Sequence, residues 1–459
     1  MAKFEQDLTG GSVSKQLIKF SLPFLLSNFI QSIYNVADMW VVSRFSSSDA
    51  AAGVANGGQI TFIVTNFVIG LTAGGTVLIG QYFGAKKHKD MKEIIGTLFS
   101  ILLIMAVFLT ISMILLSNIL IKLVQVPPEA VKDATNYFVI CMLGTVFIFG
   151  YNVVSSILRG MGDSKRPLIF VSIACVTNII LDLIFVGPLQ MGAAGAALAT
   201  IIAQALSLIL SIIYLIKNKF VFDFKFKSFR IYKDKLKQIL KIGLPMSFQN
   251  IVTGLSFLVM TILVNGYGVE ASAAMGMVGK FNSFAILPSI AMSMSVSSMV
   301  AQNIGAELYD RAKKIMRSGM IIIFPVGVIF FIIAFLFPDG IMRIFTDETL
   351  VIEQGIEYIR FFSIDYLIVP FTFCLNGLIT GSGHTTFTMI NSMMSSVLFR
   401  VPIAILFGSF FGLGLMGIGL AAPVASFGAC CISFIYFCTG RWKKTRINVS
   451  KFEVPAGDM

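Results

Sequence analysis

Four polar residues lie in stretches that are otherwise apolar enough to enter a bilayer: Asp38, Asn178, Asp182 and Thr200. A carboxylate at the centre of a membrane costs roughly 2.5 to 3.5 kcal/mol on insertion scales, so each aspartate there needs a reason. Asn178 and Asp182 are four residues apart and Asn35 and Asp38 three apart, so each pair shares a helix face. Their carboxylate, amide and hydroxyl oxygens are hard ligands and proton acceptors. The set predicts an H⁺ or Na⁺ site in which Asp38 and Asp182 bind the ion.

The sequence lacks the motifs by which proteins hydrolyse ATP or carry out other common reactions. It contains no GxxxxGK[ST] motif to hold nucleotide phosphates and no HExxH, GxSxG or SxxK motif of a hydrolase. Its two histidines, His88 and His384, lie in or near expected loops. We therefore expect neither an enzyme nor a cofactor, and any uphill transport must draw on an ion gradient.

Composition places these residues in an all-α protein with many membrane spans. Of the 459 residues, 56% are hydrophobic and 13% are charged, against about 45–50% and about 25% in soluble proteins. The apolar runs are continuous, unlike the alternating strands of a β-barrel. Since a bilayer requires about 20 residues per helix, the sequence predicts about twelve spans. Their approximate limits are 16–43, 52–82, 94–121, 133–158, 167–187, 193–216, 240–265, 273–303, 315–338, 353–380, 386–409 and 413–440.

Basic residues gather in alternate loops and predict the orientation. They follow the second, fourth, sixth, eighth and last spans, and the segment 217–241 is the richest. By the positive-inside rule these loops and both termini are cytoplasmic, in a multi-pass protein of the plasma (cell inner) membrane. The net charge of +12 is then explained by topology and anionic lipids rather than by nucleic acid.

The chain contains an internal repeat. Gln81 and Gln302 are 221 positions apart, as are Gly84 and Gly305. Other pairs with an offset of 221 or 222 are Gly160 with Gly381, Gly162 with Gly383, Tyr137 with Tyr358, and Pro23 with Pro245. One register across so many landmarks predicts two six-span halves, 1–222 and 240–459, joined by a basic linker, 223–239. An even span number gives both halves the same orientation, so a pseudo-two-fold along the membrane normal relates them.

The second half keeps the repeat but not the polar residues. The matching positions are Val259 or Met260 for Asp38, Phe399 or Arg400 for Asn178, Ile403 or Ala404 for Asp182, and Ala422 for Thr200. The oxygen ligands are therefore dispensable for the fold, and the ion site is expected in the first half alone.

Several stretches together resemble the multidrug and toxic compound extrusion (MATE) family over nearly the whole chain. They are the LP of the first span, GQYFGA with its second-half copy, RGMGD-x-x-x-P, NIILD and MGAAGAALAT. The resemblance implies twelve helices in two lobes and export of organic, often cationic, compounds by H⁺ or Na⁺ antiport. Its DinF-like branch has an ion site in the first lobe whose pattern matches Asp38, Asn178, Asp182 and Thr200, and a kinking proline that matches Pro23. The NorM-like branch uses acids of spans 7 and 10, but span 7 has none here and Asp365 is out of register.

Each of these residues also has a structural interpretation. Asp38 and Asp182 would then be a pair satisfied by neighbouring helices, while Asn178 and Thr200 would hold helices together by hydrogen bonds. Pro23 is expected to act as a hinge, although it would kink its helix in any case. Asp365 is expected to form an internal charge pair with Arg360 or Arg400. The segment 291–299 is rich in methionine, which suits either ordinary packing or a site that accepts several ligands.

We expect a central cavity between the halves, to which rocking of the two lobes gives alternate access. Helical spacing suggests that it is lined by Gln31, Tyr34, Asn35, Phe62, Asn66, Tyr151, Asn152, Met260 and Phe284. The partners are small organic molecules and the bilayer, and we expect a monomer. The alternative is a flippase for lipid-linked oligosaccharide or polysaccharide. Such proteins usually need a strongly basic cavity for phosphate, whereas the first-half polar residues are acidic and neutral, which favours the exporter.

Overall fold

The structure, a computed structural model, describes residues 5–218 and 220–444 and contains helices and no strand within them. The first half comprises α1 (Val13–Phe45), α2 (Ser48–Gly84), α3 (His88–Leu123), α4 (Val131–Leu143), α5 (Thr145–Gly160), α6 (Lys165–Val186) and α7 (Gly192–Lys217). The second half begins with α8 (Lys233–Asn265), α9 (Val269–Gly305), α10 (Tyr309–Leu336), α11 (Pro338–Arg343), α12 (Thr349–Phe362) and α13 (Asp365–Gly381). It continues with α14 (Thr385–Met393), η3 (Met394–Arg400), α15 (Val401–Ala404), η4 (Ile405–Phe410) and α16 (Gly414–Cys438).

The expected class of all-helical membrane protein is confirmed. In the described residues nine helical segments are long and apolar enough to cross a membrane, and two bent pairs raise this number to eleven. The remaining predicted span, α1, is 33 residues long, but its amides and Asp38 make it more polar than the others. Because polar side chains on a membrane helix are shielded from lipid by other helices, we expect the polar face of α1 to pack against protein.

Two predicted spans are bent and a third is irregular. Residues Pro128–Leu143 meet α5 at 50°, and α12 meets α13 at 44°. At the first bend, a Cβ on Gly144 would lie 2.3 Å from Ile201 Cγ1, so the helix there approaches α7 as only glycine allows. The span predicted at 386–409 contains two π-helical stretches, η3 and η4. Such stretches widen the helix locally and often occur at functional sites.

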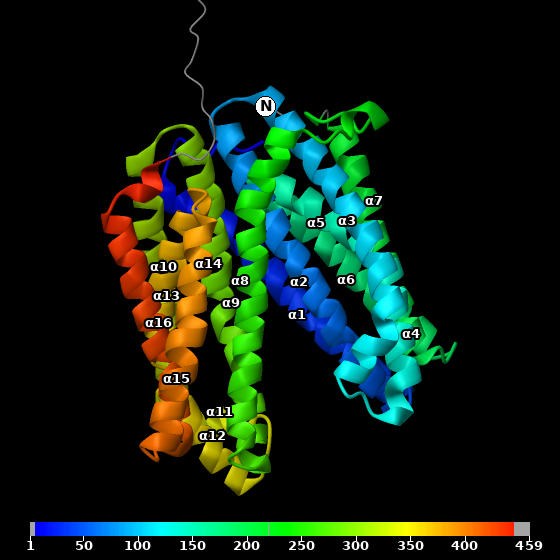
Figure 1. Ribbon diagram of the computed structural model, residues 1–459, viewed down its shortest axis with the longest axis vertical. Coiled ribbons are helices and arrows are strands. Elements are labelled where there is room, and N and C mark those ends of the chain that lie inside the picture. Colours follow the sequence, from blue (N-terminus) through cyan, green and yellow to red (C-terminus); the bar gives the residue numbers. More distant parts are fainter. Residues whose placement is uncertain (1–4, 219, 445–459) are drawn as a thin grey trace, which may run out of the picture.

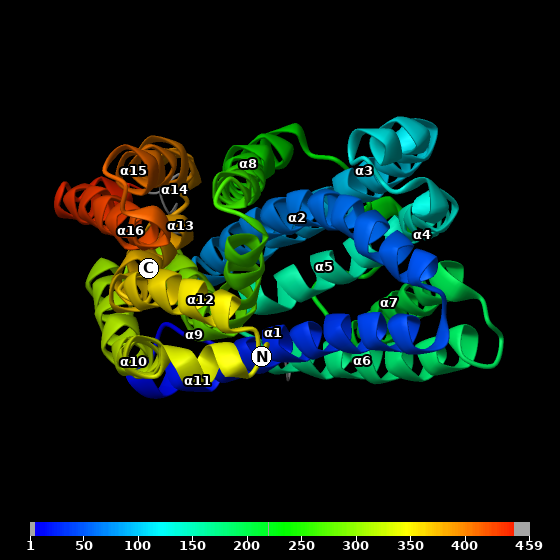
Figure 2. The same ribbon diagram turned by 90° about the horizontal axis from the view of Figure 1, so that it is seen from below.

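Figures 1 and 2 show two helical bundles side by side, with α1 and α8 passing between them. The start of α1, including Leu17 and Phe24, packs into a core of second-half residues, whereas its end, at Val42, packs into a first-half core. In α8, Ile242 lies in a first-half core and Val264 in a second-half core. The repeat divides the sequence into two halves, but the start of the first helix of each half packs in the core of the other half.

The bundles meet at the end that carries both described chain ends and the linker between α7 and α8, and they diverge toward the opposite end (Figure 1). There α2 crosses α8 and α9 at backbone contact distance. A Cβ on Gly84 would lie 1.9 Å from the carbonyl oxygen of Gln302, and a Cβ on Gly305 would lie 1.9 Å from that of Gln81. Only glycine permits this approach, which explains two of the glycines that the repeat retains.

Candidate functional site

The predicted ion-site residues come together inside the first half. Asp38 is contributed by α1, Asn178 and Asp182 by α6, and Thr200 by α7. Asn178 and Asp182 are fully buried, while Asp38 is 7% and Thr200 9% exposed. The polar face of α1 is thereby covered by α6 and α7, the helices that carry the other members of the set.

Hydrogen bonds connect this cluster. Thr200 Oγ1 lies 3.1 Å from the hydroxyl of Tyr34 and accepts a bond of 3.4 Å from Asn178 Nδ2. The carboxyl groups of Asp38 and Asp182 are close enough to interact electrostatically with each other. Two buried carboxylates that lie near each other repel, and a proton or cation bound to one of them relieves this repulsion. The pair is therefore arranged to hold a proton, or a cation in its place.

Four oxygen atoms of the cluster lack a donor. They are Asp38 Oδ1, both carboxyl oxygens of Asp182, and Asn178 Oδ1, and each is buried without a hydrogen-bond partner in the described part of the chain. Buried acceptors normally have partners, so each exception calls for an explanation. The described residues also contain no group of three or more His, Cys, Asp and Glu side chains placed so that they could hold a metal ion. The arrangement suits a proton or a hard monovalent cation better than a transition metal.

A cavity of about 160 Å³ adjoins this cluster within the first half. Gln31, Tyr34, Asn35, Tyr151 and Asn152, five of the residues expected to line a cavity, lie in its wall, as does the ion-site residue Asn178. The cavity thus leads to the amide of the polar cluster.

The other four expected cavity residues line neither this cavity nor the central one described below. Phe62 is 69% exposed, and Asn66 contributes its backbone carbonyl to a 3.2 Å bond from Asn250 Nδ2. Phe284 makes an edge contact with Phe29 at 6.3 Å between ring centroids. Met260 was expected to line the cavity, but its side chain is buried in the second-half core. Helical spacing identified its helix but not the face that packs inward.

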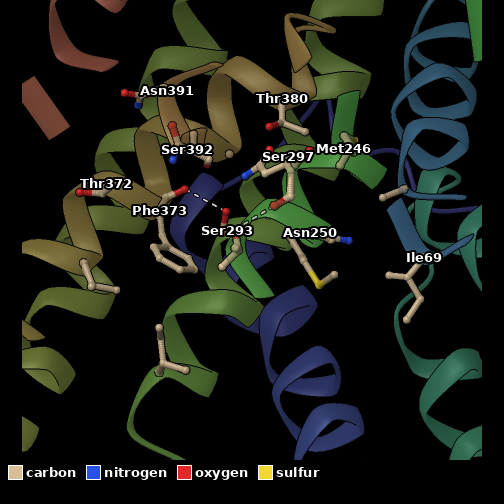
Figure 3. Close-up of a pocket in the computed structure, with 18 of the residues that line it drawn as sticks. Ile69, Met246, Asn250, Ser293, Ser297, Thr372, Phe373, Thr380, Asn391 and Ser392 are labelled. Carbon is tan, nitrogen blue, oxygen red and sulfur yellow. Dashed lines mark hydrogen bonds between the residues drawn. The ribbon is translucent and has the colours of Figure 1, made fainter. Parts of the chain in front are cut away.

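A larger cavity of about 350 Å³ lies between the two halves. Its wall combines α1, α2 and α5 of the first half with α8, α9, α13, α14, η3 and α16 of the second. Figure 3 shows Asn250 and Ser293 in its second-half wall, with Ile69 on the first-half side. Ser293 donates a 2.9 Å bond to the carbonyl of Phe373. From the methionine-rich segment, Met294 also reaches the wall, while Met292 and Met299 pack in the core.

The central cavity carries three charged side chains: Arg159, Asp365 and Arg400. Asp365 makes no ion pair at contact distance with Arg360 or Arg400 within the described residues, although the charge of Arg400 acts on it electrostatically. Arg360 is instead exposed, with its guanidinium 6.0 Å from the ring of Phe335. The expectation of acidic and neutral first-half residues fails for this cavity. Arg159 follows directly after the span expected at 133–158, but in the structure it is the penultimate residue of α5.

Reciprocal hydrogen bonds join the halves beside the close glycine contacts. Gln81 Nε2 donates to the carbonyl of Gly381 at 2.9 Å, and Gln302 Nε2 donates to the carbonyl of Gly160 at 3.0 Å. Both glutamines are fully buried. Donors and acceptors are themselves repeat partners, so one bond is the symmetry mate of the other. We call these four residues the glutamine latch.

Thr200→Val tests the hydrogen bonds of the polar cluster. Valine keeps the shape but removes the oxygen that Tyr34 and Asn178 contact, which leaves a buried amide unpaired at a cost of about 1–3 kcal/mol. We expect the apparent affinity for the coupling ion to fall several-fold, measured as the ion dependence of dye efflux from proteoliposomes. Thr200→Ser, which retains the hydroxyl, should behave like the wild type. Equal behaviour of both variants would exclude a role for this oxygen.

These features define a class of protein: a helical membrane protein with two repeated halves around a central cavity. The chain belongs to the MatE family, whose model matches it twice, at residues 23–184 and 245–406. The two matches begin 222 positions apart, at the repeat-related prolines. Since the two matches together span most of the chain, the predicted family is confirmed.

Individual relatives agree with this assignment. The chain is 30% identical to the probable multidrug resistance protein YpnP of Bacillus subtilis, over 97% of this chain and 99% of that protein. It is 26% identical to the probable multidrug resistance protein NorM of Thermotoga maritima, over 95% and 94% of the two chains. A solved MOP superfamily transporter from Pyrococcus furiosus superposes with a TM-score of 0.89 at 22% identity, covering 95% of this chain and 98% of that one. The structural likeness supports the fold.

Proposed function

We propose that this protein exports organic molecules in exchange for H⁺ or Na⁺, as a multidrug exporter of the plasma membrane. The observation that carries the proposal is the cluster of Asp38, Asn178, Asp182 and Thr200, with four buried oxygens that receive no hydrogen bond from the described residues. A bound proton or Na⁺ would supply what these oxygens lack. The names of the relatives, which are multidrug resistance proteins, support the substrate class.

The proposed orientation puts both termini and the basic linker in the cytoplasm. The glutamine latch would then close the cytoplasmic side, and the diverging lobes in Figure 1 would face outward. Loading of Asp38 and Asp182 from outside is proposed to move α1, which spans both cores and contains the hinge Pro23. Because the start of α1 packs in the second-half core, motion at the ion site reaches both lobes.

Efflux from proteoliposomes under one imposed gradient at a time tests the proposal. With ΔpH alone or ΔNa⁺ alone, a loaded dye should be transported under at least one condition, and the driving gradient identifies the ion. A protonophore should abolish H⁺-driven transport but leave Na⁺-driven transport intact. No dye movement under either gradient, in vesicles that contain folded protein, would contradict coupled export.

A further inference from the structure

We propose that the central cavity binds organic anions, a substrate class that rests on the export function proposed above and refines it. Arg159 of the first half and Arg400 of the second line the cavity, and Asp365 is the only acidic residue in its wall as described. With two positive charges and one negative, the ionised wall carries a net positive charge. An organic cation would meet like charge here, whereas an anion would be attracted by both halves.

Neither arginine has an acidic partner. Within residues 5–218 and 220–444, the ion pairs lie elsewhere, and neither guanidinium takes part in a side-chain hydrogen bond. The guanidinium of Arg159 lies 4.8 Å from the ring centroid of Phe24, and that of Arg400 lies 5.2 Å from that of Phe257. Both rings also line the cavity. A guanidinium has five N–H donors, so an aromatic contact leaves the capacity for an anion unused.

Arg400 is held in an unusual local structure. It is the last residue of the π-helical stretch η3, and its Nε is buried without a hydrogen-bond partner. Asp365, across the same cavity, is 6% exposed and also has a buried oxygen, Oδ1, without a partner. The two charges therefore share a cavity without forming a pair. A ligand that carries an oxyanion could satisfy Arg400, and its hydroxyl or protonated groups could satisfy Asp365.

The rest of the wall fits an amphiphilic ligand. Amide and hydroxyl groups, among them Asn152, Asn250 and Asn376, can donate to a carboxylate, phosphate or sulfonate. Apolar side chains such as Ile69 and Phe373 can cover an organic body. The volume of about 350 Å³ is within the range of about 300–1,000 Å³ for small-molecule sites. The expected ligand thus has an oxyanion head and an apolar or aromatic body.

Two dyes that share a xanthene ring system test this inference: fluorescein, an anion, and rhodamine 6G, a cation. Binding to the purified full-length protein in a neutral detergent is measured by fluorescence anisotropy. We expect the wild type to bind fluorescein about tenfold or more tightly than rhodamine 6G, since charge-assisted bonds are the strongest on offer. A wild-type preference for rhodamine 6G would overturn the proposal without any variant.

Arginine variants locate the site. Arg159→Gln and Arg400→Gln should each weaken fluorescein binding about tenfold and leave rhodamine 6G binding equal or tighter. Arg400→Lys should lose less, because it keeps the charge but not the fork geometry. Arg360→Gln, an exposed arginine of the same half, is the matched control and should change nothing. Fluorescein affinity that is unchanged in both cavity variants, or a loss shared equally by both dyes, would overturn the proposal.

The source of the anion is distinguished by lipid. In phosphatidylcholine nanodiscs, added phosphatidylglycerol should compete with fluorescein if a lipid headgroup is the occupant, and should have no effect if a free organic anion is. Because binding is measured without a gradient, it reports on the cavity and not on ion coupling. Failure of the dye preference would therefore leave coupled export standing, and loss of coupling would leave the anion site standing.

Discussion

Asp182→Asn is expected to abolish gradient-driven efflux. An asparagine side chain neither takes up a proton at physiological pH nor offers a negative charge to Na⁺. Bonds to charged groups contribute about 1.5–3 kcal/mol, so the initial rate should fall by at least about tenfold. Dye efflux from proteoliposomes under the gradient that drives the wild type measures this loss. Asp339→Asn, an aspartate with a half-exposed side chain that pairs only with Arg343, is the matched control and should transport normally.

The same variant decides between an ion site and a structural pair. Both carboxyl oxygens of Asp182 are buried without a donor from the described protein, so an amide of the same shape removes no hydrogen bond that the described residues make to this side chain. We expect the melting temperature of Asp182→Asn to equal or exceed that of the wild type, because a buried charge is costly. A structural pair would instead give a variant that melts earlier. Efflux that persists at the wild-type rate would contradict the ion site.

Asp38→Asn should give a similar loss, and the double variant should be no worse than either single one. Residues that act as one unit show strongly non-additive effects. Additive losses would mean that the two carboxyl groups serve separate ions. The measurement is the same efflux assay, with all variants reconstituted at matched density.

Much of this architecture could be predicted from the sequence because it follows from simple physical constraints. Long apolar runs identify the membrane helices. Polar residues within these runs are costly to bury and so indicate candidate functional sites. The repeat register identified Gln81, Gln302, Gly84 and Gly305 as landmarks. Their role, however, depends on a crossing between halves that no local pattern reveals.

The missed features share one cause: they depend on which way a side chain faces. Arg159 and Met260 were assigned by charge and by helical spacing, and each lies elsewhere than expected, in a cavity wall and in a core. The charge pair of Asp365 failed for the same reason, since nearness in sequence to Arg360 did not place the two side chains on one face. The packing of the starts of α1 and α8 in the core of the opposite half is also a tertiary feature, and the repeat in the sequence gives no sign of it.

The close glycine contacts predict a conformational effect that is independent of either binding site. Gly84→Val and Gly305→Val would place side-chain atoms where the opposite backbone carbonyl lies at 1.9 Å from a Cβ. This clash exists only while the lobes touch at the end with the glutamine latch. Overpacking costs about 1–3 kcal/mol, which would change the ratio of closed to open states by about 5- to 150-fold. We expect both variants to favour a state that is open at this end.

Spin labels at His88→Cys, the first residue of α3, and Asp310→Cys, the second residue of α10, report this change. The label distance should be short and narrowly distributed in the wild type, and longer in Gly84→Val and Gly305→Val, with slowed efflux. Gly254→Val is the matched control, because a Cβ there meets no atom within 4 Å, and its label distance should not change. Unchanged distances in both contact variants would mean that the glycines serve folding alone. A longer distance with normal efflux would mean that closure of this end does not limit transport. Since the two contacts are symmetry mates, equal shifts are expected from the two halves, even though only the first half carries the ion site.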